Sequence, residues 1–426
     1  MSNRILHLTF LAILAAAPAL GTAWLVPLAA GPTMVSCAPD ELSHAEYAVA
    51  LADGDFTVWP DSPWRMSFFP PSQYAAQTAG ILAARVGGDA AWQYRLPLQD
   101  SRLQGFPLAR VGSVLLGVLA VLALAETTRL LTNSARLGLI GGVIAALYPQ
   151  RFFISGYVNA DAFTFCAASL LVLALAGWLR RGEREDGLAA LGLAAGAVLL
   201  AKPSGFALLP PTALWVAWAW RAGHLRLRSV IATGFLALGV AAPVLAWNAI
   251  RIGALDPLGV DAYGKFVQSS MWRGEEGFVL PENAVWMFAR ALARSSFMKF
   301  SNMSLAIPAW LFGLWVVIVA VGSLLAARGL GSASASTRRM AAWLVGTLLL
   351  SVGLAVYQSF TIDFSPQGRY ILLPIVLLTM VAFLAPEQTG VRHGHLWTGA
   401  AIAYLVIVAL WSLSLLALSP CGPGIT

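Results

Sequence analysis

Two acids and a histidine follow the first apolar segment of the chain, in the stretch Pro39-Asp40-Glu41 and at His44. A proline ahead of two carboxylates is typical of a helix start, because the helix dipole favours negative charge in the first turn. On such a helix Asp40 and His44 are four residues apart and share one face. The same pattern also fits a capped amphipathic helix that lies on a membrane with its apolar residues in the lipid. The spacing therefore predicts either a polar site or an interfacial helix.

Three later turns carry polar residues beside apolar runs, namely Asn159-Ala160-Asp161, Lys202-Pro203-Ser204 and Gln367-Gly368-Arg369-Tyr370. Each has an ordinary interpretation as a helix cap, a snorkelling lysine or an interfacial anchor. If the three turns lie on the side of the membrane that holds Asp40, they bring carboxylates and cations together at one face. Such a set meets the electrostatic requirement for handling a lipid-linked phosphate.

The composition shows which solvent these residues work in. The 426 residues include only 27 Lys and Arg and 20 Asp and Glu, while 58% are hydrophobic. At 11% charged residues the chain has too little polar surface for a water-soluble fold of this length. The net charge of +7 does not indicate nucleic-acid binding, because the basic residues are scattered rather than gathered in a tail. The composition therefore predicts an all-α polytopic membrane protein.

Apolar runs long enough to cross a bilayer need roughly 20 residues each. Eleven candidate transmembrane helices lie near 5–30, 108–131, 136–154, 162–179, 187–201, 205–220, 229–250, 306–327, 340–361, 370–385 and 396–418. The first could also be a signal peptide, but its apolar run is long for a cleaved one and favours an uncleaved anchor. Two long connections remain, at 31–107 and 251–305, and both are expected to carry interfacial helices.

Basic residues in the short connections predict the orientation. With a cytoplasmic N-terminus, thirteen of them fall on the inner side: Arg4, Arg129, Arg136, Arg180, Arg181, Arg184, Arg221, Arg226, Arg228, Arg328, Arg338, Arg339 and Arg392. The short outer turns hold only Lys202 and Arg369. Both long loops and the C-terminus are then expected outside, which is the periplasmic side if the membrane is a bacterial inner membrane.

In their order and on their predicted side, these motifs resemble the GT-C superfamily of membrane glycosyltransferases. The motifs are Pro-Asp-Glu-x-x-His, Phe-Pro-Pro-x-x-Tyr, Asn-x-Asp, Lys-Pro-Ser-Gly and Gln-Gly-Arg-Tyr. The superfamily includes protein O-mannosyltransferases and the lipid A aminoarabinose transferase, and the motifs are most similar to those of a branch of bacterial membrane proteins within it. The resemblance covers residues 1–385, expected to form the catalytic module, and leaves 386–426 as a C-terminal helix with a short external tail.

The resemblance implies transfer of a sugar from a polyprenyl-phosphate donor to an acceptor hydroxyl on a glycan, lipid or protein, with inversion at the anomeric carbon. The first-loop acid of the family is the catalytic base and corresponds to Asp40. Glu41 lies beside it, as a ligand of the sugar or of a metal. Leu42-Ser43 stands where that branch commonly has Pro-Ala.

Cations must stabilise the departing polyprenyl phosphate, and Lys202 and Arg369 are the residues that we expect to do so. Tyr370 could donate a hydrogen bond to the substrate. Asp161 is expected as a second acid, and His44 as a group that orients Asp40 or binds a metal. A divalent cation, Mg or Mn, would take oxygen ligands from Asp40, Glu41 and Asp161.

The second outer loop mixes aromatic and charged residues, including Trp272 and Arg273. They suit stacking against a sugar and make Arg273 a candidate substrate ligand, but they equally suit a loop packed at the interface. Six basic residues in this region suit a rival function, a glycan ligase or polymerase with pyrophosphate donors: Arg251, Lys265, Arg273, Arg290, Arg294 and Lys299. A lipid-linked glycan flippase without chemistry is the other alternative, but should place charges near the bilayer midplane.

Three cysteines complete the candidate residues. Cys166 lies within a predicted span, where packing explains it. Cys37 and Cys421 are both expected on the outer side, so we predict a disulfide between them that ties the C-terminus to the first loop. Two unpaired thiols are the alternative.

Overall fold

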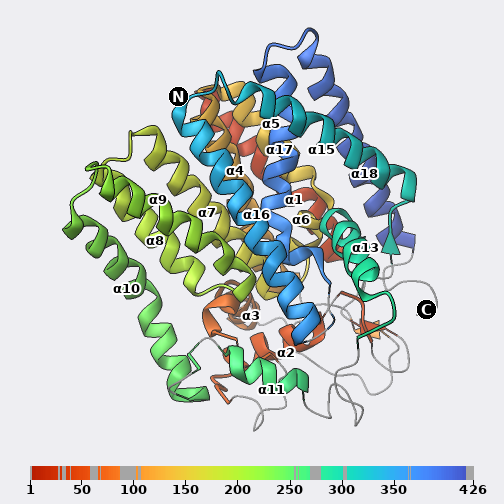
Figure 1. Ribbon diagram of the computed structural model, residues 1–426. Helices are drawn as coiled ribbons and strands as arrows, with labels where there is room; N and C mark the ends of the chain where they lie inside the picture. Colours follow the sequence, from red (N-terminus) through yellow and green to blue (C-terminus); the bar gives the residue numbers. More distant parts are fainter. Residues whose placement is uncertain are drawn as a thin grey trace.

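The computed structural model describes residues 2–26, 29–30, 35–38, 40–57, 66–67, 69–86, 102–103, 107–253, 256–257, 259–268, 280–300, 305–362, 364 and 366–418. The described part of the chain is helical almost throughout, as predicted (Figure 1). The long helices are α1 (Ser2–Leu25), α4 (Pro107–Thr132), α7 (Ala160–Arg180), α10 (Leu227–Ile252), α15 (Ala309–Gly329), α16 (Ala335–Thr361), α17 (Leu372–Gln388) and α18 (Gly394–Leu418).

These eight helices are long and apolar enough to cross a membrane, α17 being counted together with the 3-10 turn η5 (Gly368–Ile371) before it. A ninth span is obtained among the described residues if α5 (Ala135–Leu147) and α6 (Pro149–Ser155), which meet at a 66° bend, are taken as one. The chain is a multi-pass integral membrane protein.

The predicted number of eleven spans is not reached, because two of the apolar runs form short helices. α8 (Leu188–Leu199) has 12 residues and α9 (Leu209–Arg221) has 13. At 1.5 Å per residue each is about 20 Å long, against roughly 30 Å of hydrocarbon. The 3-10 turn η4 (Pro203–Leu208) joins them at the Lys202-Pro203 motif.

The core of the bundle is formed by α1, α4, α5, α7 and α17. Glycines let helices of the core approach their neighbours closely, as is common between membrane helices. A Cβ on Gly322 of α15 would lie 2.1 Å from the carbonyl oxygen of Ala382 in α17. A Cβ on Gly112 of α4 would lie 2.4 Å from that of Ala76 in α3 (Ala75–Val86).

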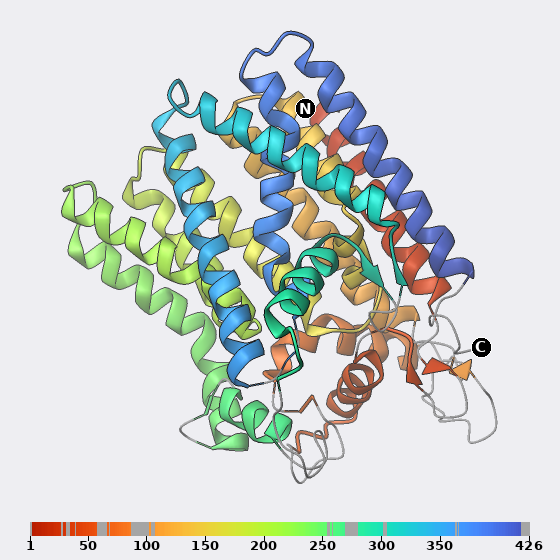
Figure 2. The ribbon, with the colours of Figure 1, turned by 45° about the vertical axis from the view of Figure 1, so that its right-hand side comes forward.

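The described parts of the two long loops contain short helices at one end of the bundle, α2 (Glu41–Ala52), α3, α11 (Val260–Gln268) and α13 (Ala284–Phe297) (Figures 1 and 2). The alternative that α2 lies on the bilayer is wrong, because Ala45, Tyr47 and Ala48 are fully buried against the 3-10 turn η1 (Pro71–Tyr74) and its neighbours.

Short antiparallel strand pairs, which an all-α prediction did not include, link loop segments: β1 (Ala29–Ala30) with β2 (Val35–Ser36) and β3 (Arg102–Leu103), and β4 (Lys299–Phe300) with β5 (Leu305–Ala306).

Two predictions fall on residues outside the described part of the chain. Arg273 is one of them, so its role as a substrate ligand stays a prediction. The other is the Cys37–Cys421 disulfide, since Cys421 lies outside the described residues. Cys37 itself is disulfide-bonded, and Cys166 is free and buried as expected.

Candidate active site

Four charged side chains from distant parts of the sequence form one chain of ion pairs. Arg369 joins the two acids, with Nη2 at 3.2 Å from Asp40 Oδ2 and Nη1 at 3.2 Å from Asp161 Oδ2. The Nζ of Lys202 lies 3.2 Å from the other oxygen of Asp161. The outer-turn residues that the sequence singled out are thus brought together at one place, which we call the charged cluster: Asp40, Asp161, Lys202 and Arg369.

Local structure fixes each member of the cluster. Asp40 is the N-cap of α2 and has a left-handed backbone with φ 58°. A left-handed backbone is strained for a residue other than glycine, though Asp tolerates it better than most. The Asp40 side chain makes no capping hydrogen bond to α2. Asp161 lies in the first turn of α7, which begins where the side chain of Asn159 accepts a hydrogen bond from the backbone N–H of Ala162 at 2.8 Å.

Backbone hydrogen bonds fix the positions of Lys202 and of Gly368, the residue before Arg369. The backbone N–H of Lys202 donates to Thr164 Oγ1 at 3.1 Å, one turn along α7 from Asp161. Gly368 donates its N–H to Ser295 Oγ of α13 at 2.6 Å. A Cβ on Gly368 would lie 1.9 Å from the backbone nitrogen of Ser296, so only glycine permits this contact of η5 with α13.

The cluster is closed on one side and accessible on the other. The side chains of Arg369 and Asp161 are each 5% exposed, whereas that of Asp40 is 36% exposed. Burial raises the pKa of the Asp40 carboxyl, but the positive charges of Arg369 and Lys202 outweigh burial and hold the pKa below its usual value. Burial also lowers the pKa of Lys202, an effect that Asp161 opposes. Asp40 is therefore an ionised, accessible carboxylate beside buried cations.

His44 lies in α2 one turn after Asp40, and its Nδ1 shares a hydrogen bond with the hydroxyl of Tyr74 at 2.6 Å. Burial, with the nearby Lys202, lowers the pKa of His44 from 6.5 to about 3, which keeps the ring neutral at physiological pH. Burial raises the pKa of Tyr74 well above 10, so its hydroxyl stays protonated. A neutral imidazole is thus fixed against the same buried face as Asp40.

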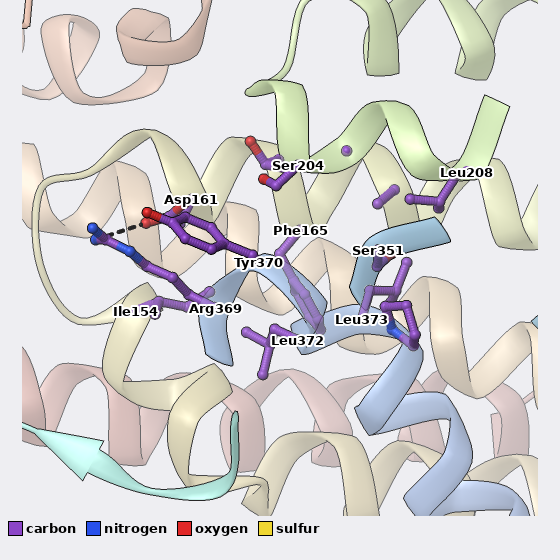
Figure 3. A pocket seen from close by; sticks show the side chains of 14 residues that line it. Ile154, Asp161, Phe165, Ser204, Leu208, Ser351, Arg369, Tyr370, Leu372 and Leu373 are labelled. Atoms are coloured by element: carbon purple, nitrogen blue, oxygen red, sulfur yellow. Dashed lines mark hydrogen bonds and ion pairs between the residues drawn. The ribbon is translucent and has the colours of Figure 1, made fainter. Parts of the chain in front are cut away.

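A pocket leads from the cluster into the apolar bundle (Figure 3). Asp161, Arg369 and Tyr370 lie at one end, and Leu208 and Leu373 lie toward the other. Its empty space is about 370 Å³, including part that is open to solvent. The pocket therefore combines a charged end with an apolar wall, as an amphiphilic ligand requires.

Arg369 keeps one donor unused. Its Nε is buried and makes no hydrogen bond to any described residue. Buried donors normally have a partner, so this N–H can bind an oxygen atom of a ligand. The Arg369 guanidinium also lies 5.9 Å from the centre of the Tyr370 ring, and the Lys202 ammonium lies 5.3 Å from that of Phe69.

Glu41 differs from the sequence expectation. Its carboxylate forms a bidentate pair with Arg110 of α4, at 2.7 Å from Nε and 2.6 Å from Nη2, and also accepts the backbone N–H of Val158 at 2.9 Å. The Nη1 of Arg110 donates to the carbonyls of Ala23 and Val26 at the end of α1, each at 2.6 Å. Glu41 thus ties α2 to α1, α4 and the start of α7, and both its oxygens are occupied.

The sequence did not single out Arg110, because a single arginine at the start of an apolar run is usually an interfacial anchor. The sequence holds one weak indication that Arg110 has a buried partner. The run that begins at Arg110 falls on the side where short outer turns otherwise hold very few basic residues. A cation there, with an unusually polar first loop, was a candidate for a buried pair.

The residues do not fit the expected three-carboxylate metal site. Glu41 is occupied by Arg110, and the Asp40 and Asp161 carboxylates are bridged by Arg369. Within the described residues, no group of three or more His, Cys, Asp and Glu side chains is arranged to hold a metal ion.

Comparison with known proteins places this geometry in context. Residues 104–247 match the family model described as dolichyl-phosphate-mannose-protein mannosyltransferase. No curated protein matches the sequence.

Among solved structures, the fold is similar to ArnT from Cupriavidus metallidurans in the apo state, with a TM-score of 0.54, 17% identity, and 96% of this chain and 64% of that one covered. It is also similar to the archaeal oligosaccharyltransferase AglB from Archaeoglobus fulgidus, in complex with an inhibitory peptide and a dolichol-phosphate, with a TM-score of 0.50, 15% identity, and 97% and 56% covered. The chain spans less than two thirds of the length of either protein.

Proposed function

We propose that this chain is a GT-C superfamily protein that transfers a sugar from a polyprenyl-monophosphate donor to an acceptor hydroxyl, a proposal supported by the family match over residues 104–247 and by the fold. The observation that carries the proposal is the charged cluster itself. An accessible carboxylate, Asp40, lies beside two buried cations, Arg369 and Lys202. Arg369 and Asp161 of the same cluster also form the charged end of a pocket with apolar walls. A base next to an anion site is what a single displacement at a glycosyl phosphate needs.

In the proposed reaction, Asp40 takes the proton of the acceptor hydroxyl as its oxygen forms a bond to the anomeric carbon. The bond between that carbon and the phosphate oxygen breaks, and its electron pair leaves with the polyprenyl phosphate. Arg369 stabilises the departing phosphate through its free Nε–H, and Lys202 adds a second positive charge. Attack opposite the leaving group inverts the anomeric configuration.

Asp161 has a positioning role in this scheme. It pairs with both cations, which holds them in fixed geometry and offsets the cost of burying them. His44 stays neutral and, held by Tyr74, fixes the face against which Asp40 lies. Tyr370 lines the pocket beside Arg369 and can donate its hydroxyl to the substrate.

The orientation is also part of the proposal. Asp161 and Arg369 lie at the starts of the spans Ala160–Arg180 and Gly368–Gln388, which supports a position of the cluster near one membrane face rather than at the midplane. The positive-inside rule assigns this face to the outer side and the N-terminus to the cytoplasm. A site near the face supports transfer and not a flippase, which needs its polar groups along the translocation path.

Purified protein in proteoliposomes provides the test. Undecaprenyl-phosphate mannose and undecaprenyl-pyrophosphate mannose, each labelled in the sugar, are supplied separately with a lipid extract of bacterial envelopes as acceptor. We expect label to move into product, with release of undecaprenyl phosphate, from the monophosphate donor. Transfer from the pyrophosphate donor alone would support the ligase alternative, and movement of intact donor across the bilayer without cleavage would support the flippase.

A further inference from the structure

Helix α13 presents two different faces. Its inner face packs on the bundle, with Phe288 5.5 Å from Phe360 of α16 between ring centres and Ser295 bonded to Gly368. Its other side exposes large apolar residues, with Trp286 66% and Met287 45% exposed. An exposed apolar face beside charged residues is typical of a helix that lies in the membrane interface.

Helix α13 contacts residues at the ends of two spans. Phe360 is one residue from the end of the span Ala335–Thr361, and Gly368 is the first residue of the span Gly368–Gln388. On the other side, Tyr148 at the bend between α5 and α6 donates its hydroxyl to the carbonyl of Ser296 at 2.9 Å. Figure 2 shows α13 across the outside of the bundle, beside the end of α16. Helix α13 therefore lies beside the ends of two spans, and a helix at the end of a span lies near the lipid headgroups.

Three cations gather on and just after this helix, and we call them the α13 cations: Arg290, Arg294 and Lys299. Trp286, Arg290 and Arg294 are spaced four residues apart and so form one stripe along the helix. Lys299 begins β4, two residues after the end of α13, and burial followed by the charges of Arg294 and Arg290 lowers its pKa. In the described part of the chain none of the three forms an ion pair.

We propose that the α13 cations bind the phosphate of an anionic phospholipid headgroup, while Trp286 and Met287 enter the adjoining acyl layer. Like charges held together without an acid are costly, and a phosphate relieves that cost. The apolar side chains beside the cations favour a lipid over a soluble anion. Arg290 and Arg294 lie on the face away from Ser295, so this site is separate from the charged cluster and its ligand is neither donor nor acceptor of the proposed reaction.

Occupancy of this site has a structural consequence. Ser295 holds Gly368, and Arg369 of the charged cluster is the next residue. A lipid that fixes α13 therefore also restrains the turn that carries Arg369.

Native mass spectrometry of the full chain in mild detergent, titrated with phosphatidylglycerol or phosphatidylcholine, tests the proposal. A basic residue near an anionic lipid surface contributes roughly fivefold to binding. The variant R290Q/R294Q should therefore lose roughly 20- to 30-fold in affinity for the first bound phosphatidylglycerol. Its matched control, R328Q/R392Q, removes two exposed arginines at the other end of the bundle and should bind like the wild type.

Equal affinity of the wild type and R290Q/R294Q would overturn the proposal, as would equal binding of phosphatidylcholine and phosphatidylglycerol. Full displacement of phosphatidylglycerol by a few millimolar inorganic phosphate would show a site for a free anion and would overturn the lipid assignment. Because the readout is binding and not sugar transfer, the result stands whether or not the proposed function holds.

Discussion

Replacing Asp40 with Asn should lower the rate of sugar transfer by roughly 10²- to 10⁴-fold, the usual contribution of a positioned general base. Asn has nearly the shape of Asp but cannot take the acceptor proton. The variant should still fold, because Arg369 keeps its pair with Asp161. The measurement is the transfer rate with polyprenyl-phosphate donor at saturation, beside thermal unfolding of the same preparation.

The pH profile of the wild type provides an independent check on Asp40. A base works only when ionised, and the pKa of Asp40 is held below 3.8. The rate should therefore stay level as the pH falls from 7 to 5, and should decline only as the pH passes below the ordinary carboxyl range. Because His44 is neutral above about pH 3, it should add no inflection to the pH profile of the rate near pH 6.5.

A transfer rate in the D40N variant equal to that of the wild type would show that Asp40 is not the base.

Replacing Glu41 with Gln should destabilise the protein by about 3–5 kcal/mol, the cost of leaving one partner of a buried ion pair uncompensated. The side chains of Glu41 and Arg110 are 0% and 2% exposed, so water cannot replace the lost partner. The Glu126→Gln variant is the matched control. Glu126 pairs with the more exposed Arg4 and Arg129, and its loss should cost less than about 1 kcal/mol. Thermal unfolding in detergent compares the two.

The double variant E41M/R110M separates a structural role of Glu41 from a chemical one. Replacing both partners of a buried pair by apolar groups is often close to neutral for stability. If Glu41 only positions α2, the double variant should regain both stability and transfer activity relative to E41Q. Regained stability without activity would contradict this assignment and return Glu41 to the chemistry.

The charged cluster could be predicted from the sequence because membrane topology is a strong constraint. Asp161 and Arg369 each stand at the start of a span, and alternation of the spans puts both on the side predicted for Asp40. Lys202 lies in the turn between the apolar runs of α8 and α9, which the sequence predicted on the same side. Helix spacing added His44 to the same face. What the sequence could not supply was the pairing, because the contact of Arg369 with both acids depends on how α2, α7 and η5 pack.

The predicted features that changed are those set by packing rather than by topology. Glu41 was grouped with Asp40 because the two are adjacent, but neighbours on a helix point about 100° apart, and Glu41 meets Arg110 instead. The number of spans was overestimated because α8 and α9 are apolar yet short, and hydropathy alone does not set helix length. The strand pairs have only two residues in each strand and leave no periodic signal.

The central claim, that the charged cluster is the phosphate site of a polyprenyl donor, is tested most directly by the affinity of purified protein for undecaprenyl phosphate. The wild type is compared with R369Q and with R392Q, a control that removes an exposed arginine between α17 and α18. We expect R369Q to lose about tenfold or more in affinity, since a charge-assisted hydrogen bond to phosphate is worth about 1.5–3 kcal/mol, and R392Q to match the wild type. Equal affinity in R369Q and the wild type would contradict the assignment of the charged cluster as the donor phosphate site.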